Sequence, residues 1–278
     1  MEEVKKALRE RILSAELTRD QLGIFYLGQE GFVFKFRGKY VLVDCYLSGK
    51  VVKDKTEHGR FYPAPIEPEA LDFVDYIFCS HEHGDHTDMP ALKRILAANE
   101  KAVIVLPAAY LKNVVEGGLP EERILPAHDG KVLSFGDITV EPLPAAHEEL
   151  HTDENGDYYE MGYRFDFGGK MTLYHSGDSC VFDGLKERVG KIDLAFLPIN
   201  GRSYYRYNSN IIGNMNLEEA LTFARDAQAK LFVPMHFDLF PFNCVPASYI
   251  PAAVEQYAEK MPYKIFQPGE GIVYMNLD

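Results

Sequence analysis

The chain has 278 residues, of which 46% are hydrophobic and 26% are charged, and its formal net charge is −13. This composition is typical of a soluble globular protein that buries a substantial core. An acidic surface gains little from contact with phosphate groups, so the charge argues against a nucleic-acid partner.

The first part of the chain is predicted to open with a helix and to continue as a β-sheet. Apolar residues recur at helical spacing from Val4 to Ala15, so residues 1–20 are predicted to form a helical N-terminal extension. Residues 23–44 are rich in Phe, Tyr and Val and are broken by glycines, which predicts three short strands joined by tight turns. Residues 46–68 are polar and contain three prolines, so we expect a long loop there.

Short apolar strands that alternate with helices are predicted from residue 75 onward. The expected strands cover 75–79 and 102–106, and the expected helices cover 89–99 and 108–116. The order then repeats, with strands predicted at 132–134, 138–143, 159–167, 171–175, 193–197, 231–233 and 272–275, and helices at 217–228 and 247–260.

Each half of the chain is therefore predicted to contain a β-meander followed by βα units. Two such sheets bury one another and leave their helices outside, which predicts an α/β (α+β) fold. The expected architecture is a four-layer αββα sandwich of two mixed β-sheets, formed as a single domain over residues 1–278.

The segment from Ser80 to Asp88 contains three of the nine histidines of the chain together with two aspartates. It follows an apolar strand, and ligands at the carboxyl ends of strands face a crevice in α/β sheets. Imidazole and carboxylate groups suit zinc, manganese or iron(II). The spacing lets His81 and His83 point one way and Asp85 and His86 another, so this turn is predicted to supply ligands to two neighbouring metals.

Four ligands from one turn cannot complete two metal shells, so further ligands are expected at other strand ends. His147 follows the strand that ends near Leu143, Asp178 follows MTLYHSG, and His236 follows LFVPM. His151 is the alternative to His147, which lies closer to its strand.

The order and rough spacing of these seven residues resemble the metallo-β-lactamase superfamily over residues 23–275. The stretches LYHSGDS (173–179) and PMHFDLF (234–240), and the long loop at 201–215, resemble its L-ascorbate-6-phosphate lactonase branch more narrowly. The resemblance implies the metallo-β-lactamase fold and two divalent ions, Mn²⁺ or Zn²⁺.

The resemblance also implies a role for each ligand. One metal would be held by His81, His83 and His147, and the other by Asp85, His86 and His236, with Asp178 bridging the two. A pair of cations lowers the pKa of a bridging water to give a hydroxide, and it polarises the substrate oxygen. Asp85 would then be the catalytic proton shuttle.

Other residues are expected to support the metals or to bind the substrate. Asp44 ends a strand, where the superfamily places a residue that supports the metal loop, and a turn aspartate is the alternative. His175 either orients a ligand or is an ordinary buried histidine. In the loop 199–215, arginine guanidinium groups can bind an anion in a bidentate manner. Arg202 or Arg206 is therefore predicted to bind an anionic group of the substrate, and the alternative is a structural loop or a homo-oligomer contact. Asn243, expected near the mouth of the site, is predicted to add a hydrogen bond to the substrate.

The leading hypothesis for function is hydrolysis of a small anionic metabolite, such as the lactone of a phosphorylated sugar acid. The alternative is a phosphodiesterase or nuclease, because the same metal pair serves that chemistry in related branches. A flavin-dependent di-iron reductase would need a partner domain for which the chain has no room, and seven candidate ligands argue against a purely structural metal site.

The cysteines and the apolar runs of the sequence predict the cellular location of the protein. No CxxC pair is present among Cys45, Cys79, Cys180 and Cys244. No apolar run approaches the length that spans a bilayer, and the charged first segment lacks the apolar core of a secretory signal. We therefore expect a cytoplasmic protein with reduced thiols and no membrane contact.

Overall fold

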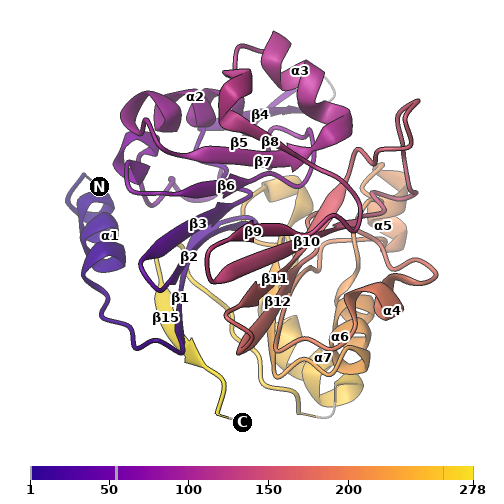
Figure 1. Ribbon diagram of the computed structural model, residues 1–278. Coiled ribbons are helices and arrows are strands. Elements are labelled where there is room, and N and C mark those ends of the chain that lie inside the picture. Colours follow the sequence, from indigo (N-terminus) through magenta and orange to yellow (C-terminus); the bar gives the residue numbers. More distant parts are fainter. Residues whose placement is uncertain (1, 54–55, 259, 278) are drawn as a thin grey trace. The chain divides into compact units, whose positions relative to one another are not determined.

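The computed structural model describes residues 2–53, 56–258 and 260–277. The chain divides into two compact units (Figure 1). Unit 1 runs to Ala127 and includes the end of the chain from Phe266, and unit 2 comprises His128–Ile265. Each unit contains one mixed β-sheet and its own helices, as the two halves of the sequence predict.

The sheet of unit 1 has seven strands in the order β15-β1-β2-β3-β6-β7-β8. The strands β1, β2 and β3 form an antiparallel meander, and β15 pairs antiparallel with β1. The strands β3, β6, β7 and β8 run parallel to one another. Their bounds are Gln21–Gly28 for β1, Gly31–Phe36 for β2, Lys39–Val43 for β3, Tyr76–Phe78 for β6, Val103–Pro107 for β7, Ile124–Ala127 for β8 and Gly271–Met275 for β15.

The helices α1 (Glu2–Ser14), α2 (Met89–Ala98) and α3 (Leu111–Glu116) contribute to the core of unit 1. Leu8 and Ile12 of α1 and Leu92 of α2 are buried in one cluster with sheet residues. Lys35 fastens α1 to the sheet, because its ammonium donates to the carbonyl oxygens of Ile12, Leu13 and Ala15 at 2.8–3.0 Å. This opening helix therefore packs into unit 1, and it ends earlier than predicted.

The sheet of unit 2 has six strands in the order β14-β13-β12-β11-β10-β9. The strands from β9 to β12 are antiparallel, and β12, β13 and β14 are parallel. Their bounds are Leu133–Phe135 for β9, Ile138–Pro144 for β10, Met161–Phe167 for β11, Met171–His175 for β12, Leu194–Pro198 for β13 and Leu231–Met235 for β14. Leu221 of α6 (Leu217–Asp226) and Val254 of α7 (Tyr249–Tyr257) pack with Leu197 of β13 in the core of this unit.

The structure differs from the sequence predictions in four segments. The predicted loop at 46–68 contains the hairpin of β4 (Lys50–Lys53) and β5 (Thr56–Gly59) and is followed by the 3-10 turn η1 (Pro68–Leu71). Strand β8 was not predicted, and neither were the short helices α4 (Leu185–Val189) and α5 (Tyr204–Asn208). These elements are polar or very short, so they lack the apolar periodicity by which strands and helices are predicted. The 3-10 turns η2 (Ala108–Tyr110), η3 (Glu121–Arg123) and η4 (Pro241–Asn243) complete the elements of the described chain.

Candidate metal centre

The parallel pairing of β3 and β6 brings the histidine-rich turn of unit 1 next to Asp44. Val43 pairs with Phe78, so the residues that follow the two strands lie at the same edge of the sheet. The backbone N–H and hydroxyl of Ser80 donate to the Asp44 carboxylate at 2.7 and 2.6 Å. His86 Nδ1 lies 2.9 Å from Asp44 Oδ2. Asp44 thus braces both the start of the turn and one of its imidazoles.

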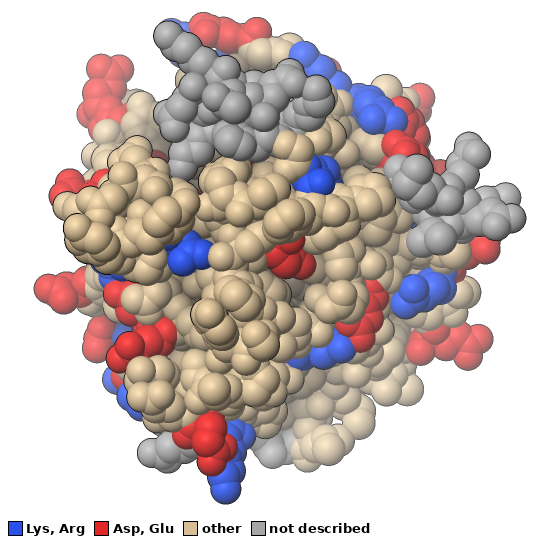
Figure 2. All heavy atoms as spheres, turned by 180° about the vertical axis from the view of Figure 1, so that it is seen from behind, with Lys and Arg blue, Asp and Glu red and all other residues tan. Residues whose placement is uncertain are grey.

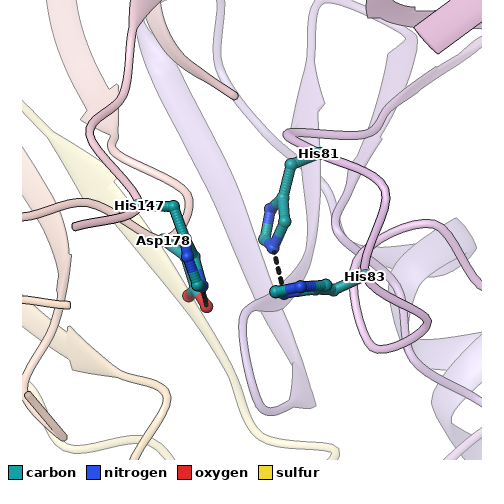
Figure 3. Close-up of side chains that lie close together, drawn as sticks. All are labelled: His81, His83, His147 and Asp178. Carbon is teal, nitrogen blue, oxygen red and sulfur yellow. Dashed lines mark hydrogen bonds and ion pairs between the residues drawn. The ribbon is translucent and has the colours of Figure 1, made fainter. Parts of the chain in front are cut away.

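The four candidate ligands of this turn form two pairs. His81 Nε2 lies 2.9 Å from His83 Nδ1, and Figure 3 shows the two imidazoles facing each other. The second pair places Asp85 Oδ2 3.7 Å from His86 Nε2. The turn keeps this shape because the His86 and Thr87 N–H groups donate to the His83 carbonyl at 2.9 and 2.8 Å.

Two further polar residues of unit 1 lie at this turn, and the sequence reasoning did not select them. Gln29 Nε2 donates to Asp85 Oδ2 at 2.9 Å, and the Glu30 carboxylate is fully buried 3.5 Å from His86 Nδ1. Both residues occupy the turn between β1 and β2, where Gln29 has a left-handed backbone with φ of 60°. The available signal was the pair of polar residues between Gly28 and Gly31 in an otherwise apolar hairpin.

In unit 2, the carboxyl ends of the parallel strands position Asp178 after β12 and His236 after β14. Asp178 Oδ1 lies 3.4 Å from His236 Nε2, and Asp178 Oδ2 lies 3.6 Å from His147 Nε2. Figure 3 shows His147 and Asp178 together. Each oxygen of this one carboxylate therefore faces a different histidine.

The other histidines predicted near this site have different surroundings. His151 is half exposed, and its Nδ1 lies 3.4 Å from Glu160 Oε2. His175 is fully buried, and its Nδ1 accepts a hydrogen bond from the Gly177 N–H at 3.3 Å. Since Gly177 directly precedes Asp178, His175 braces the turn that carries that carboxylate.

The separations within each unit fit ligands of a metal ion. Tetrahedral ligands at zinc–nitrogen distances of about 2.0–2.1 Å lie about 3.3 Å from one another. The 3.4, 3.6 and 3.7 Å separations around Asp178 and between Asp85 and His86 are close to that spacing, and they are longer than ordinary hydrogen bonds. The donor atoms are imidazole nitrogens and carboxylate oxygens, which suit Zn²⁺ or Mn²⁺.

Known proteins resemble this chain in sequence and in fold. A family model described as a β-lactamase superfamily domain matches residues 39–237. A UPF0173 metal-dependent hydrolase of Bacillus mycoides is 31% identical over 263 residues, which cover 90% of this chain and 98% of the relative. The chain belongs to the metallo-β-lactamase superfamily. Within it, the chain is a member of the UPF0173 metal-dependent hydrolases, so it is an enzyme that depends on a metal.

Solved structures resemble this UPF0173 protein over most of its length. An isothiocyanate hydrolase from Delia radicum gut bacteria has a TM-score of 0.72 and 17% identity, covering 91% of this chain and 100% of its own. The metallo hydrolase Igni18 of Ignicoccus hospitalis has a TM-score of 0.67 and 20% identity, with coverage of 92% and 99%. These similarities confirm the predicted metallo-β-lactamase fold of two mixed sheets with helices.

The arginines predicted to bind substrate have partners within the protein. Arg202 forms an ion pair with Glu219 of α6. Arg206 of α5 donates to the Cys244 carbonyl at 2.6 Å and to Asn243 Oδ1 at 3.4 Å. Burial lowers the pKa of Arg206 from its ordinary value. These contacts brace the loop, and a role in substrate binding stays a prediction.

The surface of this loop and the nearby Cys180 have different properties. Tyr204, Tyr205 and Tyr207 of α5 are 87%, 68% and 65% exposed, so an interface with a second copy also stays a prediction. Burial raises the pKa of the Cys180 thiol, which favours the neutral form over the nucleophilic thiolate. Cys180 therefore serves packing, and its Sγ–H donates to the Ile212 carbonyl at 3.2 Å.

Proposed function

We propose that this UPF0173 protein is a two-metal hydrolase of a small anionic metabolite, of the lactonase type that acts on L-ascorbate 6-phosphate. His81, His83 and His147 would hold one ion, Asp85, His86 and His236 the other, and Asp178 would contribute to both. His81, His83, His147 and Asp178 are a set of residues that could hold a metal ion.

The geometry of Asp178 is the observation that carries this proposal. Its two oxygens have different histidine neighbours, since Oδ2 faces His147 and Oδ1 faces His236. Asp178 is also only 4% exposed, so water offers little compensation for its charge. Divalent cations held by this cluster would supply that compensation.

The metals and the protein would divide the chemistry. When bound, two cations lower the pKa of a water and polarise the substrate carbonyl. Asp85 would take up a proton from the attacking water and return it to the leaving oxygen. Gln29 holds Asp85 in place by donating to Oδ2 at 2.9 Å. In this proposal the ligands and the proton shuttle are side chains of this chain, and the reaction needs no serine or cysteine nucleophile.

The proposed substrate is a small anion, and charge supports its small size. The net charge of −13 disfavours long nucleic acids. On the face drawn in Figure 2, outside the grey atoms, Lys and Arg side chains are scattered among acidic and uncharged residues. The lactone preference is supported by the sequence likeness of residues 173–179 and 234–240 to the lactonase branch.

The test is a hydrolysis screen with protein that has been stripped by a chelator and reconstituted with Mn²⁺ or Zn²⁺ alone. Phosphorylated lactones are compared with bis-p-nitrophenyl phosphate as a model diester. Turnover of lactones without turnover of the diester is the expected result. The reverse result would replace the lactonase by a phosphodiesterase, and turnover that survives chelation would contradict the metal-dependent mechanism.

A further inference from the structure

The base of the loop between β13 and α6 is held together tightly. The Gly201 N–H donates to the Met215 carbonyl at 2.8 Å, and Asn200 forms an antiparallel bridge with Asn216. A Cβ atom on Gly201 would lie 1.7 Å from the Asn214 carbonyl oxygen, so only glycine fits there. The two ends of the loop therefore form one fixed structure within unit 2.

Asn200 lies at this base in contact with the metal-ligand candidate His236. Its Nδ2 is 2.9 Å from His236 Nδ1, and its Oδ1 accepts a hydrogen bond from Asn214 Nδ2 at 2.9 Å. Asn200 is fully buried and Asn214 is 4% exposed. Within the described residues, Asn214 Oδ1 is buried and has no hydrogen-bond partner.

We propose that Asn200, held by Asn214, is a positioning residue that fixes His236 for metal binding. This inference rests on the two-metal function proposed above. A histidine that binds a metal through Nε2 carries its proton on Nδ1 and donates it to a neighbour. A half-turn of the Asn200 amide presents its oxygen to Nδ1 and its NH₂ group to Asn214. A half-turn of Asn214 then presents Oδ1 to accept that hydrogen bond.

The backbone and the ring of His236 both have a defined geometry. Its φ of 55° lies in the left-handed region, which residues other than glycine seldom adopt. Nε2 of the same ring lies 3.4 Å from Asp178 Oδ1, so a rotation of the ring would move its candidate ligand atom away from that oxygen. The amide pair prevents this rotation and selects Nε2 as the ligand.

The experiment measures metal affinity directly, by titrating the metal-free full chain with Mn²⁺ and then Zn²⁺ in competition with a chelator. Asn200→Leu keeps a similar volume but cannot accept the Nδ1 proton. We expect it to weaken the binding of one of the two ions by roughly 10–100-fold, the usual loss of affinity when such a partner is removed. Asn200→Asp restores the acceptor, and we expect it to bind within about threefold of the unmodified protein.

The control is a buried asparagine of unit 1. Asn99 is 5% exposed, donates to the Val74 carbonyl at 2.7 Å and accepts from the Lys101 N–H at 3.0 Å. Asn99→Leu should lower the melting temperature of the metal-free protein and leave its metal dissociation constants unchanged. Equal metal affinity in Asn200→Leu and the unmodified chain would overturn the proposal, as would equal losses in Asn200→Leu and Asn99→Leu.

A second variant covers the case in which Asn200→Leu does not fold. Asn214→Leu leaves Asn200 in place and removes the hydrogen bond that holds it. We therefore expect metal binding to weaken by about 2–10-fold, which corresponds to the free energy of one hydrogen bond. An unchanged dissociation constant in that variant would overturn the proposal. An unmodified chain that binds no divalent ion would contradict the two-metal function itself, which separates the two failures.

Discussion

The two units supply candidate metal ligands in different ways. Unit 1 presents His81, His83, Asp85 and His86 from one turn after one strand, and hydrogen bonds inside that turn set their positions. Unit 2 presents His147, Asp178 and His236 from the ends of three strands, so the register of the sheet and the loop base position them. The difference teaches that the ligands of a compact motif are brought together by the chain itself, whereas scattered ligands are brought together only by the pairing of the strands.

The largest loss of hydrolysis is expected when Asp178, which faces two histidines, is replaced. Asp178→Asn should reduce hydrolysis by on the order of 10³-fold or more, because charge stabilisation by metal ions contributes several kcal/mol. It should also reduce the metal content by more than one ion per chain, as measured by elemental analysis. His83→Ala in unit 1 should abolish hydrolysis but remove at most one ion. Equal metal losses in the two variants would contradict a special role for Asp178.

Asp85 tests whether the compact turn supplies chemistry in addition to ligands. Asp85→Asn should lower kcat by roughly 10²–10⁴-fold, the usual contribution of a positioned acid or base, with a smaller change in KM. Steady-state kinetics with the reconstituted variant measure the two parameters. Near-full turnover in Asp85→Asn would refute the proton-shuttle assignment. A fall in kcat caused only by lost metal would be revealed by recovery at saturating metal concentration.

Gly213 tests the dependence of unit 2 on its loop. A Cβ atom at this position would lie 2.4 Å from Cε1 of His147, so Gly213→Ala must displace the imidazole. We expect kcat to fall by about 10²-fold, because a displacement of 1 Å at a reacting centre has an effect of that size. Gly49→Ala is the matched control, since a Cβ atom there meets nothing within 4 Å. Equal activity of the two alanine variants would show that His147 does not need its present position.

The smallest effects are expected at the arginines of the loop. If Arg202 or Arg206 binds an anionic group, alanine substitution should raise KM by about tenfold, the value of a charge-assisted hydrogen bond, and leave kcat largely unchanged. Kinetics with a phosphorylated lactone and with its uncharged analogue separate anion binding from loop bracing. Unchanged KM values in both variants would end the substrate-binding prediction.

The difference between local and scattered ligands also explains which parts of the molecule could be predicted from the sequence. The turn in unit 1 is local, so residue spacing alone was enough to propose its four ligands. The meander-then-βα order also predicted both sheets, because apolar periodicity reports burial. The polar hairpin of β4 and β5 and the short helix α5 carry no such periodicity and were missed.

Supports that come from distant segments could not be predicted. Gln29 contacts Asp85 from a turn that lies 56 residues earlier in the chain. Asn200 contacts His236 because β13 and β14 are neighbours in the sheet, and an asparagine after a strand carries no ligand signal by itself. Tertiary pairing creates these contacts, and residue type alone does not report it.

The most direct test of the account is to count the ions and to determine whether they are coupled. The chelated full chain is reconstituted with Mn²⁺, its stoichiometry is measured, and its electron paramagnetic resonance spectrum is recorded. A shared Asp178 carboxylate predicts two ions per chain and the spectrum of an exchange-coupled manganese pair. One ion per chain, or two ions with the six-line spectrum of isolated Mn²⁺, would contradict the proposed two-metal centre.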